Sequence, residues 1–173
     1  LYVTGVQTCA LPISLPASYG GVETFIDGLC NEDSKLGVIN SVLTLHPSPS
    51  KNPIEMKGYV VNQAKQNFYY ASTGFSLSAF GMFKKLSADA QIIHYHFPNP
   101  FADLLQLICA PKKPSLVTYH SDIIKQRNLL KVYAPLRNRF FNSVDGVVST
   151  SPNYFYTSEF LQTLADKTHV IPI

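Results

Sequence analysis

The sequence lacks the features that mark several large classes of protein. It contains no tryptophan, only 14% charged residues and a formal net charge of +3. Its lysines and arginines are scattered rather than gathered in stripes, so charge gives no indication of nucleic-acid binding. No P-loop, zinc-finger spacing or RNA-binding aromatic motif occurs. We therefore expect neither a P-loop nucleotidase nor a nucleic-acid-binding protein.

Cysteines and long apolar runs are also scarce. Cys9, Cys30 and Cys109 are odd in number and have no CxxC spacing, which is typical of buried thiols in a reducing compartment. The longest nearly apolar run, Leu104 to Ala110, is interrupted by Gln106 and is far shorter than the roughly 20 residues that cross a bilayer. These absences indicate a soluble, cytoplasmic protein and leave open peripheral contact with the inner face of a membrane.

What the sequence does contain is an alternation of buried strands and amphipathic helices. A length of 173 residues with 46% hydrophobic content suits one domain with a substantial core. Strands are expected near residues 38–45, 58–62, 67–71, 91–97, 115–119, 144–149 and 169–173, and helices near 22–36, 77–86, 101–110, 129–140 and 152–164. Such alternation predicts an α/β fold, a Rossmann-like doubly wound parallel sheet with helices on both faces.

Two of these elements carry finer expectations. The short strands 58–62 and 67–71 suggest a hairpin or an edge pair. Pro135 is expected to kink or break the helix that contains it.

The first residues differ in character from the rest. Val3 to Ile13 resembles the in-frame translation of a widely used DNA sequencing-library adapter. We expect residues 1–13 to be non-native and native sequence to begin near Ser14, so that an upstream strand is missing. Because its apolar residues suit a buried position, the segment is nevertheless expected to fit the slot of a first strand.

A glycine pair, Gly20-Gly21, ends the loop that precedes the first predicted helix. Glycines at a helix N-terminus allow a ligand to approach the backbone closely, and the unpaired N–H groups there favour an anion such as a phosphate. The alternative is a simple turn and N-cap, since two glycines lack the specificity of a full dinucleotide fingerprint.

Histidines mark the ends of two neighbouring strands. In Ile92-Ile93-His94-Tyr95-His96-Phe97, alternation places His94 and His96 on one face and Tyr95 on the other. Since ligands of open α/β sheets bind beyond the carboxyl ends of the strands, His96, His120 and the glycine pair are expected to open onto one crevice. His94 lies one pleat further back, and we expect it to be a partly buried histidine bonded to a neighbour.

The residue types also suggest a metal site or a hydrolase triad. A metal site formed by His94, His96, His120 and His46 lacks a carboxylate at a typical partner spacing, so no metal or other cofactor is expected. His120-Ser121-Asp122 contains the residue types of a hydrolase triad, but sequence neighbours cannot adopt its relay geometry and no GxSxG elbow is present. For each histidine a purely structural role remains an alternative.

A basic and aromatic region follows the second histidine-bearing strand. It comprises Lys125, Arg127, Lys131, Tyr133, Arg137, Arg139, Phe140 and Phe141. The ordinary interpretation is a solvated helix face above a core face, and the alternative is contact with an anionic membrane or a lipid-linked substrate.

Several motifs together resemble the N-terminal half of a family 4 glycosyltransferase, in the right order and spacing from Leu15 onward. They are Tyr19-Gly20-Gly21-Val22-Glu23, Ile92-Ile93-His94-Tyr95-His96-Phe97-Pro98-Asn99-Pro100, Val117-Thr118-Tyr119-His120-Ser121-Asp122-Ile123, Ser149-Thr150-Ser151-Pro152 and Val170-Ile171-Pro172-Ile173. Each motif alone is weak, and the ordered set is fairly specific.

The resemblance implies a GT-B enzyme with two Rossmann-like domains facing each other across a cleft. In such enzymes the glycine pair, here Gly20 and Gly21, approaches the donor diphosphate and sugar, and the histidine matched by His120 lies beside the reacting sugar. His96, Asn99, Ser121 and Asp122 match positions on the acceptor side. The implied reaction is retaining hexosyl transfer from a nucleotide-sugar donor to a glycan or lipid-linked acceptor, normally without a bound metal. Mannosyl- or rhamnosyl-type transferases of bacterial surface polysaccharide assembly are the most similar.

Residues 14–173 would then be the acceptor-side domain, and the donor-binding domain would lie beyond Ile173. On this expectation the chain is an inactive fragment of an active parent. Two alternatives remain: a nucleotide-sugar epimerase of the same fold, with acid and base groups in the missing half, and a non-catalytic Rossmann-like binding module.

Overall fold

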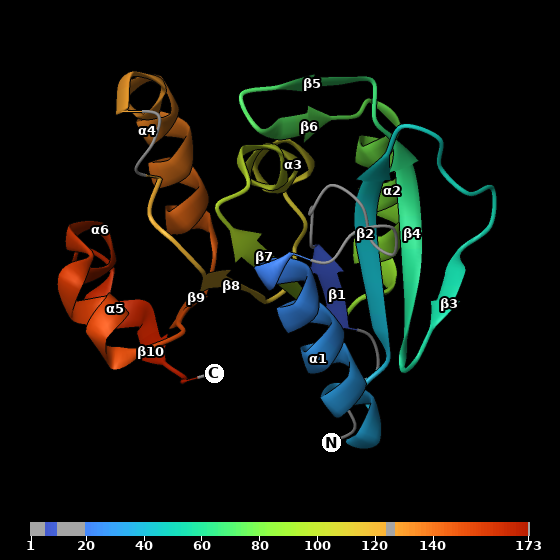
Figure 1. Cartoon of the computed structure of the whole chain (residues 1–173), viewed down its shortest axis with the longest axis horizontal. Helices are drawn as coiled ribbons and strands as arrows, with labels where there is room; N and C mark the ends of the chain where they lie inside the picture. The colour runs from blue at the N-terminus through green and yellow to red at the C-terminus, as the bar shows by residue number, and fades with distance from the viewer. Residues whose placement is uncertain (1–5, 10–19, 124–126, 173) are drawn as a thin grey trace.

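The computed structural model describes the backbone of residues 6–9, 20–123 and 127–172. It describes the side chains of residues 20–123 and 131–172. Within these ranges an eight-stranded sheet runs in the order β10-β9-β8-β7-β1-β2-β4-β3, and only β3 is antiparallel to its neighbour (Figure 1). Its strands are β1 (Val6–Cys9), β2 (Asn40–His46), β3 (Ile54–Met56), β4 (Tyr59–Lys65), β7 (Ile92–Phe97), β8 (Ser115–Tyr119), β9 (Gly146–Ser149) and β10 (Thr168–Val170).

The order of the parallel strands is that of a doubly wound sheet. The chain moves outward from β1 through β2 to β4, then returns to the other side of β1 and continues through β7, β8, β9 and β10. The winding direction therefore reverses between β1 and β7, and ligands of such sheets bind at the carboxyl ends of the strands beside this point. β1, which belongs to the adapter-like segment, lies between β2 and β7 and so occupies the place of a first strand. That the segment is non-native stays a prediction.

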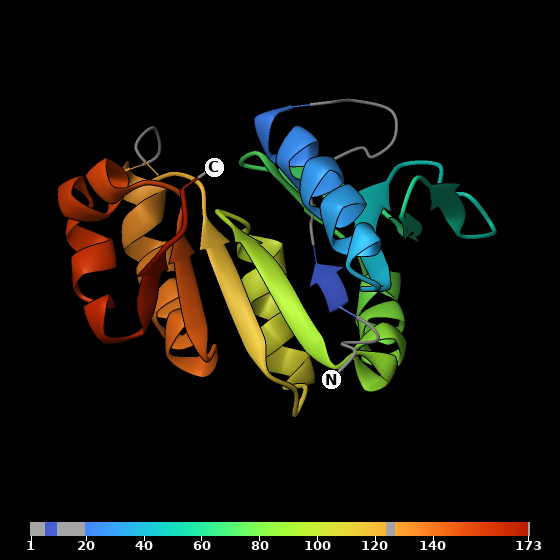
Figure 2. The ribbon, with the colours of Figure 1, turned by 90° about the horizontal axis from the view of Figure 1, so that it is seen from below.

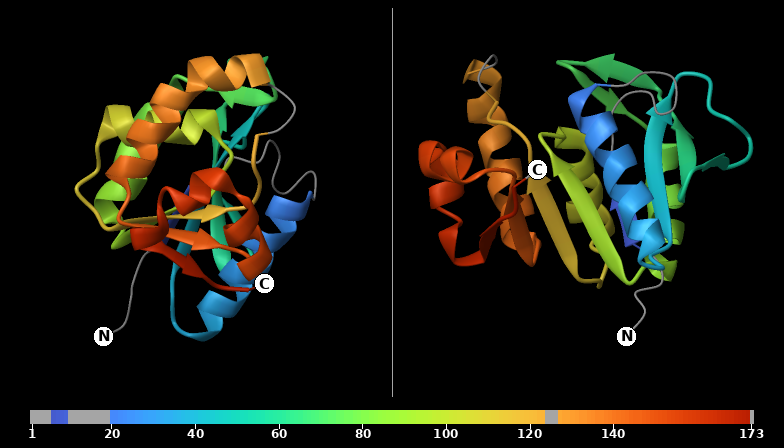
Figure 3. Two further views of the ribbon diagram at one scale, coloured as in Figure 1. Left: turned by 90° about the vertical axis from the view of Figure 1, so that its left-hand side faces the viewer. Right: turned by 60° about the horizontal axis from the view of Figure 1, so that its bottom comes forward.

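Helices cover both faces of the sheet. They are α1 (Gly21–Lys35), α2 (Ser78–Asp89), α3 (Pro100–Cys109), α4 (Arg127–Ser143), α5 (Pro152–Thr157) and α6 (Glu159–Gln162), with a 3-10 turn at Ala165–Lys167. Figures 2 and 3 show α1 on one face and α2, α3 and α4 on the other. The predicted α/β class and doubly wound arrangement are confirmed.

Two buried clusters hold the layers together. The larger one joins the sheet to α2, α3 and α4, and Tyr95 of β7 packs edge-on against Phe140 with ring centroids 5.3 Å apart. The smaller one joins α1 to the sheet and contains Ile26 and Cys30 against Val42. Burial of each such aliphatic or aromatic side chain contributes about 1.5–3 kcal/mol.

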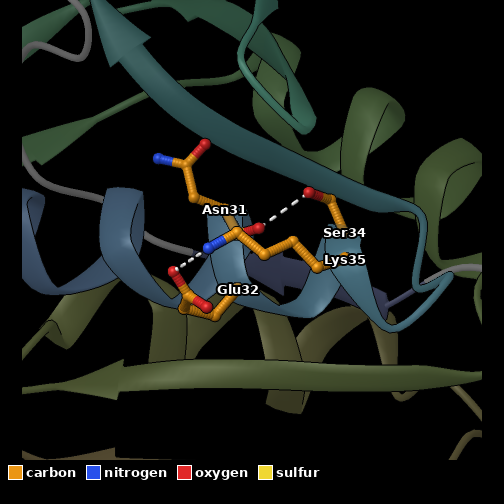
Figure 4. A network of polar contacts seen from close by, with 4 residues as sticks. All are labelled: Asn31, Glu32, Ser34 and Lys35. Carbon is orange, nitrogen blue, oxygen red and sulfur yellow. Dashed lines mark hydrogen bonds and ion pairs between the residues drawn. The ribbon is translucent and has the colours of Figure 1, made fainter.

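The end of α1 is fixed by local contacts. Gly37 has φ +80° and its N–H donates to the carbonyl of Ser34 at 3.1 Å. Figure 4 shows the preceding turn, where Ser34 Oγ donates to the carbonyl of Asn31 and Lys35 pairs with Glu32 at 2.6 Å. Because both charged side chains are exposed, this ion pair adds little stability.

The hairpin expectation for residues 58–62 and 67–71 was wrong. The first segment extends into β4, an inner strand held by β2 on one side and β3 on the other. The second segment is β5 (Phe68–Tyr70), which pairs antiparallel with β6 (Thr73–Phe75) in a separate two-stranded sheet. Strands β3 and β6 have three residues each, too few for a hydrophobic period to appear in the sequence.

One helix expectation is narrowed and another needs correction. Pro135 does not break α4, which continues from Arg127 to Ser143, so of the two outcomes expected there only a kink stays a prediction. The single helix expected over 152–164 is divided into α5 and α6, because Ser158 begins a new helix by accepting a hydrogen bond from the N–H of Leu161. At the start of α5, Ser151 is the N-cap, with its Oγ accepting from the N–H of Tyr154 at 3.0 Å.

Gly58 is a position where only glycine fits. It has φ +85°, and a Cβ there would lie 2.5 Å from Ser34 Oγ and 2.8 Å from Ser34 Cβ. We expect Gly58→Ala to destabilise the chain by about 2 kcal/mol, from the left-handed backbone together with the clash. Urea unfolding followed by circular dichroism measures this change.

Gly28→Ala is the matched control, since Gly28 lies inside α1 and a Cβ there meets no atom within 4 Å. This variant should be more stable than the wild type by up to about 1 kcal/mol. Equal effects of the two substitutions would contradict the packing of α1 against the turn before β4.

Candidate functional site

The predicted site residues gather at the carboxyl edge of the sheet. Gly20 is the N-cap of α1, which follows β1, while His96 lies near the end of β7 and His120 directly follows β8. Tyr19, the first residue of the glycine motif, lies outside the described residues. The ends of three adjacent strands therefore supply the glycine pair and both histidines.

The glycine pair is not required by the backbone conformation. Gly20 has φ −96°, an ordinary value, and a Cβ there would meet only the flexible Glu23 side chain, with Oε2 at 2.6 Å. Among the described residues, a Cβ on Gly21 would meet nothing within 4 Å. The first N–H groups of a helix have no partner within the helix, and the glycine pair brings no side chain of its own over those of α1. The Glu23 carboxylate in this first turn would compete with any anion that binds there.

Three imidazoles are stacked across β7 and β8. The ring centroids of His94 and His96 lie 4.5 Å apart and those of His96 and His120 lie 5.3 Å apart. His94 Nε2 bonds with Thr118 Oγ1 at 2.7 Å, and His96 Nδ1 bonds with His120 Nε2 at 3.0 Å. The prediction that His94 is a buried histidine bonded to a neighbour is confirmed. We call these three side chains the histidine row.

Burial keeps the histidine row uncharged. Burial lowers the pKa of His94 to about 3, with a further contribution from His120. Burial also lowers the pKa of His120 to about 4. The pKa of His96 falls well below 6.5, first through burial and then through the nearby His94 and His120. All three rings are therefore neutral at pH 7, and each has one N–H donor and one lone-pair acceptor.

The unpaired nitrogen of His96 indicates which atoms carry the protons. His96 Nε2 is buried and has no hydrogen-bond partner among the described residues. A buried N–H without a partner is rarer and more costly than a buried lone pair, so we expect the proton of His96 on Nδ1. His96 then donates to His120 Nε2, which leaves His120 with its own proton on Nδ1.

Phe25 connects the histidine row to α1. Its ring meets His96 and His120 edge-on, with centroid distances of 5.8 Å and 5.0 Å. Phe25 lies four residues after Gly21, on the same helix. This contact fixes the glycine pair and the two histidines relative to each other. The sequence predicted only that Phe25 lies in the helix expected near 22–36, because nothing in its spacing shows which strand it faces.

Asn99 has a structural task at the edge of the site. It is the N-cap of α3, and its Oδ1 accepts a hydrogen bond from the N–H of Ala102 at 3.0 Å. Pro100 follows at the first helical position, where proline loses no needed N–H. This cap fixes the path of the chain immediately after His96 and Phe97.

Ser121 and Asp122 differ in their surroundings. Ser121 is exposed next to His120. The Asp122 carboxylate accepts hydrogen bonds from Tyr119 Oη and, at 3.1 Å, from Ser158 Oγ, and its N–H donates to Tyr154 Oη at 2.6 Å. These bonds tie the end of β8 to α5 and α6, so Asp122 serves first as a structural anchor.

Other candidates from the sequence lie apart from the histidine row. His46 bonds with the carbonyl of Ser48 at the end of β2. In the part of the chain that the structure describes, no group of three or more His, Cys, Asp or Glu side chains is placed to hold a metal ion. Likewise, no helix among residues 20–123 and 127–172 has the length and apolar character to cross a bilayer.

The aromatic members of the basic and aromatic region belong to the core. Phe140 and Phe141 are fully buried, and Tyr133 Oη donates to Asp103, whose pKa burial raises well above its usual value. Arg137 lies over the ring of Phe160 at 3.6 Å. Lys125 and the side chain of Arg127 lie outside the described part. The arrangement is that of a solvated helix face above a core face.

The neutral state of His94 makes stability depend on pH. Its folded pKa of about 3 lies below the unfolded value of 6.5, so the unfolded chain binds more protons between these values. The contribution of neutral His94 to the free energy of unfolding is therefore fully present above about pH 6.5 and is lost as the pH falls towards 3. At pH 5 the loss from His94 is about 2 kcal/mol. Urea unfolding at pH 7.5 and pH 5 measures the loss of unfolding free energy between these two pH values. For His94→Gln this loss should be smaller than for the wild type by about 2 kcal/mol. Equal losses for the two proteins would contradict a buried neutral His94.

The chain is similar to known proteins over most of its length. The sequence profile described as Glycosyltransferase Family 4 matches residues 19–172. The chain is 48% identical over 157 residues to the D-rhamnosyltransferase WbpZ of Pseudomonas aeruginosa, covering 91% of the chain and 41% of that protein. It is 45% identical to the O-antigen chain mannosyltransferase C of Escherichia coli, covering 91% and 42%. The chain thus spans about two fifths of the length of these relatives.

Solved structures support the fold. The alignment with sucrose-phosphate synthase from Thermosynechococcus elongatus covers 98% of this chain and 48% of the synthase chain, with a TM-score of 0.73 and 16% sequence identity. The alignment with the catalytic domain of starch synthase IV from Arabidopsis thaliana covers 98% of this chain and 51% of the synthase chain, with a TM-score of 0.60 and 15% sequence identity. Since the family profile covers nearly all of the described residues, the chain belongs to glycosyltransferase family 4.

Proposed function

We propose that this chain is the acceptor-side domain of a retaining glycosyltransferase. The parent protein moves a hexosyl group from a nucleotide sugar to a glycan or lipid-linked acceptor in bacterial surface polysaccharide assembly. The observation that carries the proposal is the bond between His96 and His120, which Phe25 holds beside the N-terminus of α1. The names of the two relatives, a rhamnosyltransferase and an O-antigen mannosyltransferase, support a sugar of this kind.

Each residue has a defined task in this proposal. Gly20 and Gly21 admit the diphosphate or sugar of the donor to the N–H groups of α1, where the helix dipole favours negative charge. His120 lies beside the reacting sugar and presents a neutral imidazole with its proton on Nδ1. His96 is a positioning residue, because it acts by holding the orientation and protonation of His120.

A neutral imidazole suits this chemistry. It donates a hydrogen bond to a sugar oxygen at pH 7 without placing a positive charge beside the cationic sugar that develops as the donor bond breaks. The low pKa of His120 maintains that neutral state. No bound metal is required of this half, and the donor-binding half lies in sequence beyond the chain.

Membrane contact is the remaining part of the proposal. Lys131 and Arg139 are exposed on α4 and suit the anionic inner face of a bacterial membrane, where a lipid-linked acceptor would be found. Vesicle sedimentation should show binding that rises with anionic lipid. Binding independent of lipid charge would count against this contact.

The function is tested with the full-length protein encoded by the gene. Incubated with nucleotide-activated mannose or rhamnose and a mannose oligosaccharide, it should transfer the sugar with the anomeric configuration retained, as read from the product by NMR. The 173-residue chain alone should transfer nothing. Absence of transfer by the full-length protein with either donor would contradict the proposed function.

The role of His120 is tested in the same protein. His120→Ala should lower kcat/KM at least about 100-fold, the scale of a positioned polar catalytic group. His46→Ala is the matched control, since His46 is a surface histidine at the end of β2 that bonds with Ser48, and it should transfer at the wild-type rate. Similar rates for both variants would remove His120 from the reaction.

A further inference from the structure

A second feature of the carboxyl edge is a small pocket to which the Pro98-Asn99 segment contributes. Its polar and backbone lining comes from Gln66 after β4, from Ser72, Thr73 and Gly74 in the β5–β6 hairpin, and from Pro98 and Asn99 after β7. We call this space the Gln66 pocket. Its volume of about 40 Å³ holds roughly two or three water-sized groups.

The chemistry of the Gln66 pocket selects a neutral ligand. Among the described residues the lining contains amides and hydroxyls together with leucine and proline, and no charged side chain. A phosphate would find no cation there, and a metal ion would find no carboxylate. Amides and hydroxyls beside apolar walls suit a molecule that has both hydroxyl groups and C–H faces.

One atom in this pocket is left without a partner. Gln66 Oε1 is buried and accepts no hydrogen bond from any described residue. A buried carbonyl in this state costs roughly 1–3 kcal/mol, which a donor entering the pocket would recover. A ligand hydroxyl can make this bond, because it is an uncharged donor of the right size.

The space beside Gln66 exists because residue 74 is glycine. A Cβ on Gly74 would lie 2.8 Å from Gln66 Oε1 and 3.2 Å from Leu45 Cδ1, so a larger residue there would displace the Gln66 amide and narrow the pocket. The turn before it is also unusual, with Ala71 and Ser72 both at positive φ, 48° and 61°. Asparagine and glycine are the residues that such a turn favours. Non-glycine residues at these angles carry strain, and strain of this kind gathers at binding sites.

The location connects the Gln66 pocket to the proposed reaction. Asn99 is three residues beyond His96, so their Cα atoms are at most about 11 Å apart. Strand β5, which pairs with the pocket-lining strand β6, carries Phe68, Tyr69 and Tyr70, each more than half exposed. This exposed aromatic strand beside β6 offers a surface on which a sugar ring can stack.

We propose that the Gln66 pocket is a subsite that receives one hydroxyl-bearing edge of a sugar unit of the acceptor glycan. Gln66 Oε1 accepts a hydrogen bond from a sugar hydroxyl, Thr73 adds a second polar contact, and the aromatic strand β5 covers the outer part of the sugar. The assignment of this sugar to the acceptor rests on the proposed function. The sugar-binding site itself does not.

Binding is tested on the chain by NMR. A mannose trisaccharide is titrated into 15N-labelled protein, and shifts are expected at Gln66, Thr73 and Asn99 with saturation in the millimolar range. Gln66→Leu should weaken binding at least tenfold while leaving the chain as stable as the wild type, because it removes the unpaired carbonyl. Gly74→Ala should also weaken binding by displacing the Gln66 amide and narrowing the pocket.

Thr157→Val is the matched control, since Thr157 bonds to its own helix on α5 and lies outside the pocket. It should bind the trisaccharide as the wild type does. Shifts centred elsewhere, wild-type binding by a folded Gln66→Leu chain, or shifts that never saturate would overturn the subsite.

The full-length protein separates this inference from the proposed function. There, Gln66→Leu should raise the KM for acceptor about tenfold and leave both kcat and the KM for donor unchanged. Transfer with an unchanged acceptor KM would overturn the subsite and keep the function. Saturable binding at Gln66 without any transfer by the full-length protein would overturn the function and keep a sugar site.

Discussion

The hydrogen bond between His96 Nδ1 and His120 Nε2 is the interaction on which this site depends. It joins the ends of two neighbouring parallel strands, and it forms because the register of β7 and β8 sets His96 opposite Thr118 and therefore close to His120. The same register brings His94 to Thr118. A shift of one residue would turn these side chains to the opposite face and expose the core aromatics instead.

The two faces of β7 have different roles, one in the core and one in the candidate site. Tyr95 and Phe97 point into the aromatic core beneath α4, where Phe140 and Phe141 hold the strand in place. The opposite face carries the histidines, covered by Phe25 of α1. Rigid packing on one face thus supports polar chemistry on the other, and the neutral state of the imidazoles follows from how completely they are enclosed.

The sequence predicted the elements that carry a clear hydrophobic period and not the contacts between them. Alternation in Ile92 to Phe97 was enough to place His94 and His96 on one face, and the order of elements was enough for the sheet. The separation of β4 from β5 was missed because Gly74 and the turn at Ala71 and Ser72 form a hairpin three residues deep. Phe25 and Gln66 were missed as site residues because their roles arise from neighbours distant in sequence.

The central claim is that His96 donates to a neutral His120, and the 15N chemical shifts of the imidazole nitrogens measure this directly. At pH 7 we predict that both rings are neutral with the proton on Nδ1, and that a hydrogen-bond coupling joins His96 Nδ1 to His120 Nε2. A charged ring at either position, or a proton on His96 Nε2, would contradict the account.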